Sequence, residues 1–120
     1  MSWEQEISEL ALRNTLSEKM GGDEKVARQH DFGKLTIRER VDKIADPGSF
    51  HEIGKLAGVG EYDEHGNLKD FTPSNYIFGT AEINGKPVIV SGDDFTVRGG
   101  SADASIAGKR LKAEGLAVEL

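Results

Sequence analysis

Apolar residues recur at helical spacing along the first part of the chain. Residues 2–20 carry a stripe of such positions, which predicts an amphipathic helix that buries this stripe. The stripe consists of Trp3, Ile7, Leu10, Ala11 and Met20, with Leu12 and Leu16 beside it. Gly21 and Gly22 end this helix, and a second, shorter helix is predicted over residues 24–30 before Gly33.

The stretch "GKLTIRERVDKIADPGSF" predicts a third helix. Thr36 followed by Glu39 is the pattern of a capping box, and Pro47 with Gly48 marks the end of the helix. The apolar positions Ile37, Val41 and Ile44 repeat at helical spacing. Four-residue spacing predicts charge pairs between Arg38 and Asp42 and between Glu39 and Lys43.

The apolar pattern changes to strand spacing after residue 48. "SFHEIG" predicts a short strand, and residues 76–83 and 87–90 predict a hairpin turned by Asn84-Gly85, with half-buried alternation in its first strand. Pro87 indicates either an edge strand or the start of a strand. Residues 56–75 are rich in glycine and polar residues without a clear period, which predicts a mobile loop.

The last twenty residues predict a helix that begins at Ser101. Its expected buried stripe contains Ala104, Ala107, Leu111 and Val118. The fold class is therefore α+β: N-terminal helices, a β-hairpin and a following helix. A two-stranded sheet is marginal by itself, so we expect this arrangement to be completed by further strands, and the chain to self-associate without them.

Composition narrows the functional classes. The net charge of −6 disfavours nucleic-acid binding, which needs cations to neutralise phosphates. The chain has no cysteine, which excludes disulfides and thiolate chemistry. It contains no apolar run of the ~20 residues that a membrane span needs, and its acidic N-terminus is unlike a targeting signal. We therefore expect a cytoplasmic protein without a membrane partner.

The glycine pair in "DDFTVRGGSADAS" is the main candidate for chemistry. Gly99, Gly100 and Ser101 would open a helix, where backbone amides can bind a phosphate with help from Arg98. The same residues also fit a tight turn with a serine cap, and both interpretations remain open. Asp93 and Asp94 are adjacent and would point to opposite sides of a strand, so they are expected to be turn and strand-end residues and not an acid–base pair.

The other polar clusters favour structural roles. His30, His51 and His65 lack the spacing of metal ligands, and Glu61, Asp63, Glu64 and Asp70 lack that of a calcium loop. A basic segment contains Arg28, Lys34, Arg38, Arg40 and Lys43. Because acidic residues interleave with it, a helix at a subunit contact is favoured over a DNA-binding helix.

Two blocks carry a family resemblance: "ARQHDFGKLTIRERVDKIADPGSFHEIG" over residues 27–54 and "FGTAEINGKPVIVSGDDFTVRGGSADASIAGKR" over residues 78–110. In this order they resemble the N-terminal part of the carboxyltransferase β subunits of biotin-dependent acyl-CoA carboxylases, such as the propionyl-CoA and methylcrotonyl-CoA carboxylase β chains. The resemblance implies that residues 51–120 begin a ClpP/crotonase-like domain, preceded by a helical segment over residues 1–50.

The resemblance also implies carboxyl transfer from carboxybiotin to an acyl-CoA. Biotin would be carried by a separate domain, and the partners would be other carboxyltransferase subunits in a homo-oligomer and a biotin carboxylase/carrier subunit. The family's oxyanion-hole motifs follow the last helix and do not occur here, so no residue is predicted to be catalytic. Arg98, Gly99, Gly100 and Ser101 are predicted to help bind CoA. The alternative is a non-catalytic assembly module that docks on carboxylase subunits.

Overall fold

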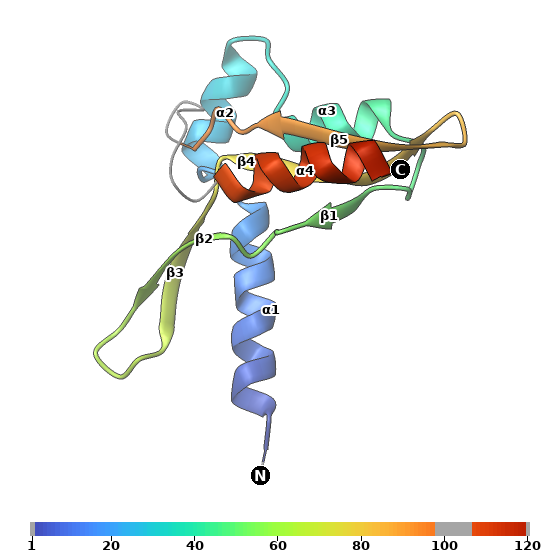
Figure 1. Cartoon of the computed structure of the whole chain (residues 1–120). Coiled ribbons are helices and arrows are strands. Elements are labelled where there is room, and N and C mark those ends of the chain that lie inside the picture. The colour runs from blue at the N-terminus through green and yellow to red at the C-terminus, as the bar shows by residue number, and fades with distance from the viewer. Residues whose placement is uncertain (1, 98–106, 120) are drawn as a thin grey trace.

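The computed structural model describes residues 2–97 and 107–119. These ranges contain three helices, then five strands, then a fourth helix, which is an α+β arrangement as expected. In chain order they are α1 (Glu4–Glu18), α2 (Asp23–Asp31), α3 (Ile37–Ile44), β1 (His51–Ile53), β2 (Gly58–Tyr62), β3 (Leu68–Pro73), β4 (Tyr76–Ile83), β5 (Lys86–Asp93) and α4 (Ala107–Glu119). Helix α1 extends away from the body that the other helices form around the larger sheet (Figure 1).

The larger sheet contains three antiparallel strands in the order β1-β4-β5. The predicted β4–β5 hairpin is confirmed, with Asn84 and Gly85 at φ angles of 52° and 77°. These are the two positive φ angles that a two-residue type I′ turn requires. Asp46, just after α3, accepts hydrogen bonds from both turn amides at 2.9 and 2.8 Å, so the end of α3 is tied to the tip of the hairpin.

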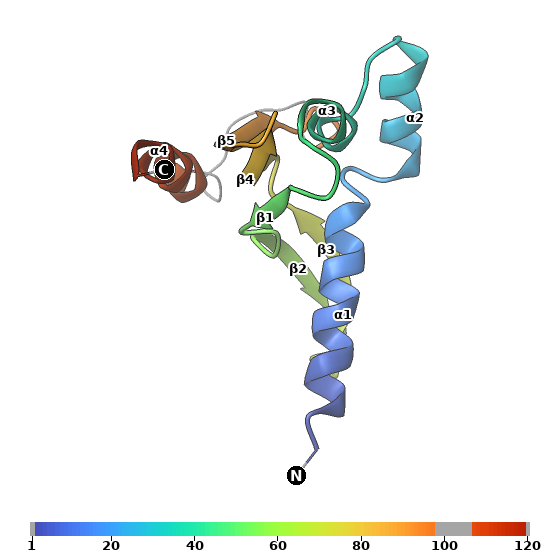
Figure 2. The same cartoon turned by 90° about the vertical axis from the view of Figure 1, so that its right-hand side faces the viewer.

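The hairpin lies between two helices (Figure 2). On one face, Val41 of α3 and Ala45, just after its end, pack against Ala81 and Val90. On the other face, α4 covers the first half of β4, where its residue Ala113 lies in a second core with Tyr76 and Phe78. The expected half-buried alternation is therefore wrong for Tyr76–Gly79, because all four of these residues are buried.

A second hairpin occupies the segment that was predicted to be a loop. Strands β2 and β3 pair in antiparallel register, and Asp63 accepts hydrogen bonds from the backbone amides of His65 and Asn67 in the turn. Leu68 and Phe71 are buried. The loop prediction was wrong because Gly58 and Gly60 lie within β2. Gly58 must remain glycine, since a Cβ there would lie 2.3 Å from the carbonyl oxygen of Thr72.

Helix α1 was predicted to bury an apolar stripe, and this prediction is wrong for the described chain. Trp3, Ile7 and Leu10 are 65%, 64% and 48% exposed, and the buried residue of this helix is Ser17. A different face of α1 contacts the β2–β3 hairpin, where the Arg13 guanidinium donates a hydrogen bond to the Tyr62 hydroxyl. Just after the helix, Lys19 pairs with Asp70 at 2.6 Å.

The buried stripe predicted for α4 is also wrong where it can be compared. Leu111 and Val118 are 72% and 88% exposed, whereas Lys109 and Ala113 are buried. The side chains of Ala104 and Ala107 lie outside the described part. The helix is rotated relative to the expected phase because a small residue, Ala113, allows close approach to Tyr76 and Phe78.

Helix α3 confirms its predicted capping box, in which Thr36 and Glu39 exchange side-chain and backbone hydrogen bonds. Its predicted charge pairs are wrong. Arg38 instead pairs with Glu52 on β1, and Glu39 instead lies 2.6 Å from the Nε2 atom of His30. Both partners come from other elements, and a pattern limited to one helix does not include them.

Candidate functional site

The candidate site lies where β5 ends and α4 begins. The predicted ligand-binding residues Arg98, Gly99, Gly100 and Ser101 fall within residues 98–106, outside the described part of the chain. The site is therefore described by the residues that flank this segment on both sides. Three sets of contacts connect the flanks to the rest of the fold.

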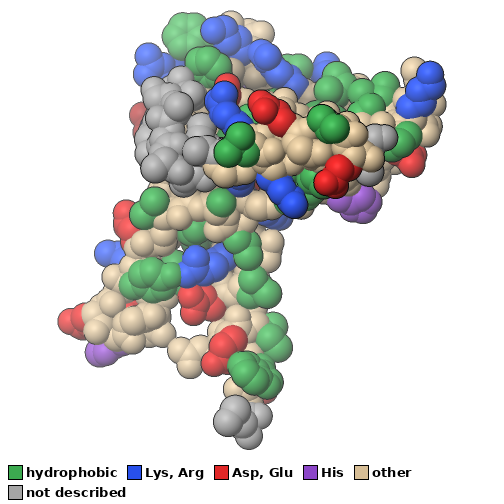
Figure 3. All heavy atoms as spheres, in the orientation of Figure 1, with side chains coloured by type: hydrophobic (Ala, Val, Ile, Leu, Met, Phe, Trp, Pro, Cys, Tyr) green, Lys and Arg blue, Asp and Glu red, His purple; other side chains and the backbone are tan. Residues whose placement is uncertain are grey.

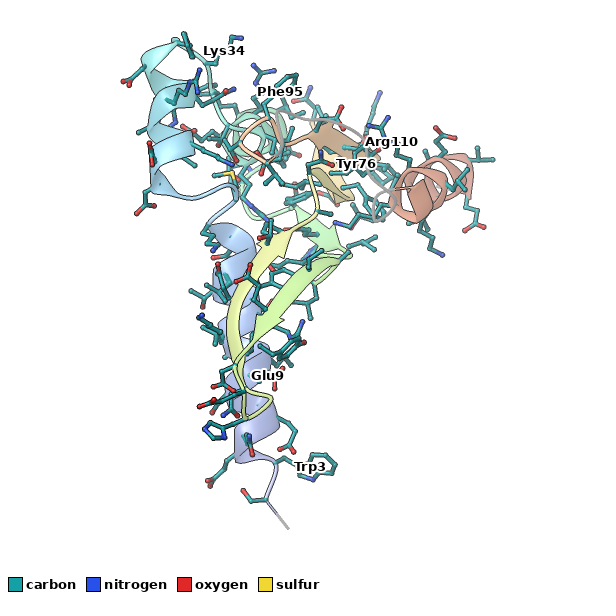
Figure 4. The ribbon with its side chains drawn as sticks, turned by 90° about the vertical axis from the view of Figure 1, so that its left-hand side faces the viewer. Trp3, Glu9, Lys34, Tyr76, Phe95 and Arg110 are labelled. Carbon is teal, nitrogen blue, oxygen red and sulfur yellow. The ribbon has the colours of Figure 1, made fainter. Side chains whose placement is uncertain are left out.

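The first contact joins the two flanks directly. The Arg110 guanidinium on α4 donates a hydrogen bond to Asp93 at the end of β5, with an N–O distance of 2.7 Å. The same guanidinium lies over the Tyr76 ring, 5.0 Å from its centre, and Figure 4 shows the two side chains next to each other. An exposed ion pair contributes only about 0–1 kcal/mol to stability. The cation–π contact with the Tyr76 ring adds to this and makes the position of the Arg110 guanidinium more specific.

The second contact set fixes the turn after β5. The buried Asp94 carboxylate accepts hydrogen bonds from the Thr96 amide at 2.9 Å and the Thr96 hydroxyl at 2.6 Å. The Thr96 hydroxyl in turn accepts a hydrogen bond from the Gly21 amide at 2.9 Å. A Cβ on Gly21 would lie 1.8 Å from the Thr96 carbonyl oxygen, so this approach requires glycine. Asp93 thus binds Arg110, whereas Asp94 binds Thr96.

The third contact set anchors α4 through a buried lysine that sequence reasoning missed. The Lys109 ammonium donates hydrogen bonds to the Ser74 hydroxyl at 2.8 Å and to the Tyr76 carbonyl oxygen at 2.9 Å. Burial lowers the pKa of Lys109, and the carboxylate of Glu52 opposes this shift. A serine beside a lysine is also a nucleophile–base geometry. Neither residue lines either of the grooves described below, so the contact is assigned to packing.

Beside Lys109, a partly buried ion pair joins α3 to β1. The Arg38 guanidinium binds the Glu52 carboxylate with two N–O distances of 2.7 and 3.2 Å, and the Glu52 side chain is only 10% exposed. Such two-point pairs hold a defined geometry. In the sequence, Glu52 lies within a short apolar segment, and nothing in its spacing points to Arg38.

A groove opens on the other side of this turn, between α3 and the segment Asp93–Thr96. It measures about 680 Å³, and a smaller groove of about 390 Å³ adjoins it beside α2. The larger groove has an apolar floor that includes Ile37 and Val90, and its lining includes three cations: Lys34, Arg40 and Lys43. Among the described residues, none of these three has an ion-pair or side-chain hydrogen-bond partner. Figure 4 shows Lys34 and Phe95 at this end of the molecule.

The remaining candidates from the sequence are three histidines and four acidic residues. His51 and His65 are exposed, and His30 is exposed beside Glu39. Glu61, Asp63, Glu64 and Asp70 lie on the β2–β3 hairpin, where Asp70 pairs with Lys19. Within residues 2–97 and 107–119, no group of three or more histidine, aspartate and glutamate side chains is arranged to hold a metal. No helix in these ranges has the length and apolar character to cross a membrane.

Comparison with known proteins identifies the family. The model of the carboxyl transferase domain matches residues 28–120, which is most of the chain. The chain belongs to the carboxyl transferase family. The resemblance that the two sequence blocks indicated is therefore confirmed.

Curated members of the carboxyl transferase family are similar along most of the chain. The propionyl-CoA carboxylase carboxyltransferase subunit of Haloferax mediterranei is 35% identical over 120 residues, which are 100% of this chain and 23% of that protein. The methylmalonyl-CoA carboxyltransferase 12S subunit of Propionibacterium freudenreichii subsp. shermanii is 37% identical over 102 residues, or 80% of this chain and 18% of that protein. The chain thus spans about a quarter or less of these relatives.

Solved structures of the carboxyl transferase family confirm the fold. A transcarboxylase 12S structure, described as a hexamer with methylmalonyl-CoA bound, matches 97% of this chain and 23% of its own with a TM-score of 0.79 and 30% identity. The β subunit of geranyl-CoA carboxylase from P. aeruginosa matches 97% of this chain and 22% of its own, with a TM-score of 0.67 and 25% identity. The chain therefore has the fold of the corresponding part of crotonase-like carboxyltransferase domains.

Proposed function

We propose that this chain forms the N-terminal part of a cytoplasmic acyl-CoA carboxyltransferase subunit, which transfers a carboxyl group from carboxybiotin to an acyl-CoA. The observation that carries the proposal is the match of residues 28–120 to the carboxyl transferase domain, together with the fold shared with a transcarboxylase that was solved with methylmalonyl-CoA. In this proposal residues 1–50 form a helical segment and residues 51–120 begin the crotonase-like N-terminal domain of the carboxyltransferase. Biotin arrives on a carrier subunit, and further carboxyltransferase subunits complete the oligomer.

The residues proposed to bind CoA are Arg98, Gly99, Gly100 and Ser101. Support comes from their flanks, because both ends of this segment are held by specific contacts. Asp94 and Thr96 fix the end of β5, and Lys109 and Arg110 fix the start of α4. Glycine amides before a helix are suited to a phosphate, and an arginine adds charge. Fixing the flanks reduces the ordering cost that a ligand must overcome.

The chemistry proposed for the chain is binding and orientation. Carboxyl transfer needs donors that stabilise an enolate oxygen, and in the resembled family these donors follow the last helix. The sequence predicted no catalytic residue in this chain. The chain would therefore position the acyl-CoA while residues outside 1–120 stabilise the reacting oxygen.

The test is an assay of carboxyl transfer from carboxybiotin to acyl-CoA. The product of the whole reading frame that contains this sequence should carboxylate an acyl-CoA, and residues 1–120 alone should not. In the active protein, Arg98→Ala should raise KM for acyl-CoA by about 10- to 100-fold with little change in kcat, because a charged hydrogen bond present throughout the reaction is lost. Lys86→Ala, at the other end of β5, is the control and should change neither constant. An unchanged KM in Arg98→Ala would contradict the CoA assignment, and a complete protein that docks on carboxylase subunits without turnover would favour the assembly module.

A further inference from the structure

One pair of residues in the sequence is prone to a spontaneous chemical change. Asn84 is directly followed by Gly85, whereas the other three asparagines precede threonine, leucine and tyrosine. Glycine has no side chain, so its backbone nitrogen can approach the side chain of the preceding residue closely. The pair forms the turn between β4 and β5, and both residues are exposed in the described chain. Figure 3 shows this turn at the right-hand end of the molecule, with basic side chains and backbone atoms at its surface.

The change is deamidation through a cyclic imide. The Gly85 backbone nitrogen gives up its proton and attacks the Asn84 side-chain carbonyl carbon, so that a new carbon–nitrogen bond closes a succinimide ring. The side-chain nitrogen takes up a proton and leaves as ammonia. Water then opens the ring at either of its carbonyl carbons and gives aspartate or isoaspartate at this position. The reaction consumes one water and releases one ammonia, and it needs no further reactant.

The carboxylate of Asp46 lies against both backbone amides of this turn. Its Oδ1 atom accepts a hydrogen bond from the Asn84 amide at 2.9 Å, and its Oδ2 atom accepts one from the Gly85 amide at 2.8 Å. Asp46 is itself held in place, because its amide donates to the Glu82 carbonyl oxygen at 2.7 Å and its carbonyl oxygen accepts from the Ser49 hydroxyl at 2.7 Å. The nitrogen that must lose its proton is therefore held against a negative charge.

We propose that Asn84 is a latent deamidation site and that the Asp46 carboxylate suppresses the reaction. A hydrogen bond from the protonated form of a group disfavours its deprotonation, and a nearby negative charge disfavours the anion that forms. Both effects act on the Gly85 nitrogen across the N–O distance of 2.8 Å. Every atom of this contact belongs to residues 46–85, so the inference requires no assumption about the chain outside residues 1–120. It also does not rest on the proposed enzymatic function.

Deamidation would undo the contact that restrains it. The reaction replaces a neutral amide by a carboxylate on the residue whose backbone Asp46 binds, and neighbouring carboxylates repel each other. Isoaspartate further lengthens the backbone of a two-residue turn that needs two positive φ angles. The product should therefore lose the link between the end of α3 and the tip of the β4–β5 hairpin.

The test compares the rate of deamidation with and without the Asp46 carboxylate. The product of the whole reading frame that contains this sequence is incubated at neutral pH in water enriched in heavy oxygen, and the peptide that contains Asn84 is followed by mass spectrometry. Asp46→Asn should deamidate at Asn84 about 10- to 100-fold faster than the wild type, because a hydrogen bond to a charged group no longer opposes deprotonation. The substituted side chain precedes Pro47, which has no backbone N–H, so it cannot close a ring of its own.

Asp42→Asn is the matched control. It removes the same charge from an exposed position of α3, one helical turn before Asp46, and should deamidate at Asn84 at the wild-type rate. In concentrated urea the wild type and both variants should deamidate at equal rates, because the contact is absent from unfolded chains. Circular dichroism checks that Asp46→Asn is folded.

Hydrogen exchange of the wild type measures the same effect without a variant. Base-catalysed exchange creates the same nitrogen anion, so the Gly85 amide should exchange at least about 10-fold more slowly in the folded protein than in urea. A Gly85 amide that exchanges equally fast in both conditions would overturn the proposal. So would a folded Asp46→Asn protein that deamidates at Asn84 no faster than the wild type.

Discussion

Gly79 on β4 is the position where the addition of one methyl group tests the packing most sharply. A Cβ there would lie 2.2 Å from the carbonyl oxygen of His51 and 2.8 Å from the Phe50 ring. Ordinary contact begins near 3.4 Å, so Gly79→Ala must move the β1 backbone by about 1.2 Å. Backbone hydrogen bonds weaken steeply over such a distance. The β1–β4 pairing should therefore break locally.

The expected cost follows from two effects. Overpacking of this kind costs about 1–3 kcal/mol, and each backbone hydrogen bond lost costs about 0.5–1.5 kcal/mol. Glu52 is the register partner of Gly79, so its displacement also disturbs the ion pair with Arg38. Gly79→Ala should lower the free energy of unfolding by about 2–4 kcal/mol. The measurement is urea unfolding followed by circular dichroism.

Gly92 on β5 provides the matched control. A Cβ at Gly92 would lie 2.2 Å from the end of the Ile37 side chain, which can rotate, and no backbone atom is close. Gly92→Ala should therefore cost less than about 1 kcal/mol. Equal costs for the two variants, or a Gly79→Ala protein as stable as the wild type, would refute the account of β1 packing.

Three further predictions concern stability. Hydrogen bonds from His30 and Thr36 hold the pKa of Glu39 at about 2, against an ordinary value of 4.5. The free energy of unfolding should thus fall as pH drops from about 4.5 to about 2, and Glu39→Gln should flatten this fall in acid titrations. Because burial lowers the pKa of Lys109, the unfolded state binds more protons than the folded state in the alkaline range. The free energy of unfolding should therefore rise with pH in that range, and Lys109→Met should abolish this rise in unfolding experiments at alkaline pH. A Cβ at Gly115 in α4 meets no atom within 4 Å, so Gly115→Ala should stabilise the chain by about 0.5–1 kcal/mol in urea unfolding, and a loss of stability would contradict the described packing of α4.

Local signals predicted the elements whose geometry is set by neighbouring residues. The capping box of Thr36 and Glu39 and the Asn84-Gly85 turn depend on side chains and φ angles within a few residues, and both are confirmed. The family resemblance rested on two ordered motif blocks and is confirmed by the domain match.

Contacts between distant elements could not be predicted in the same way. Lys109 is buried because Ser74 and Tyr76, more than thirty residues earlier, supply acceptors, and a helical period treats a lysine as exposed. Asp42 lies one helical turn from Arg38, yet Arg38 pairs with Glu52 because the fold brings β1 within reach of its side chain. The β2–β3 hairpin was not predicted because its glycines indicated a loop, whereas Gly58 allows the backbones of the two strands to approach closely.

The most direct test of the central claim is the carboxyl-transfer assay on the whole reading-frame product, with acyl-CoAs of increasing chain length and carboxybiotin as donor. We expect a carboxylated acyl-CoA whose formation depends on both substrates, and no product from residues 1–120 alone. A folded whole protein that forms no carboxylated product with any acyl-CoA tested, or turnover by residues 1–120 alone, would contradict it.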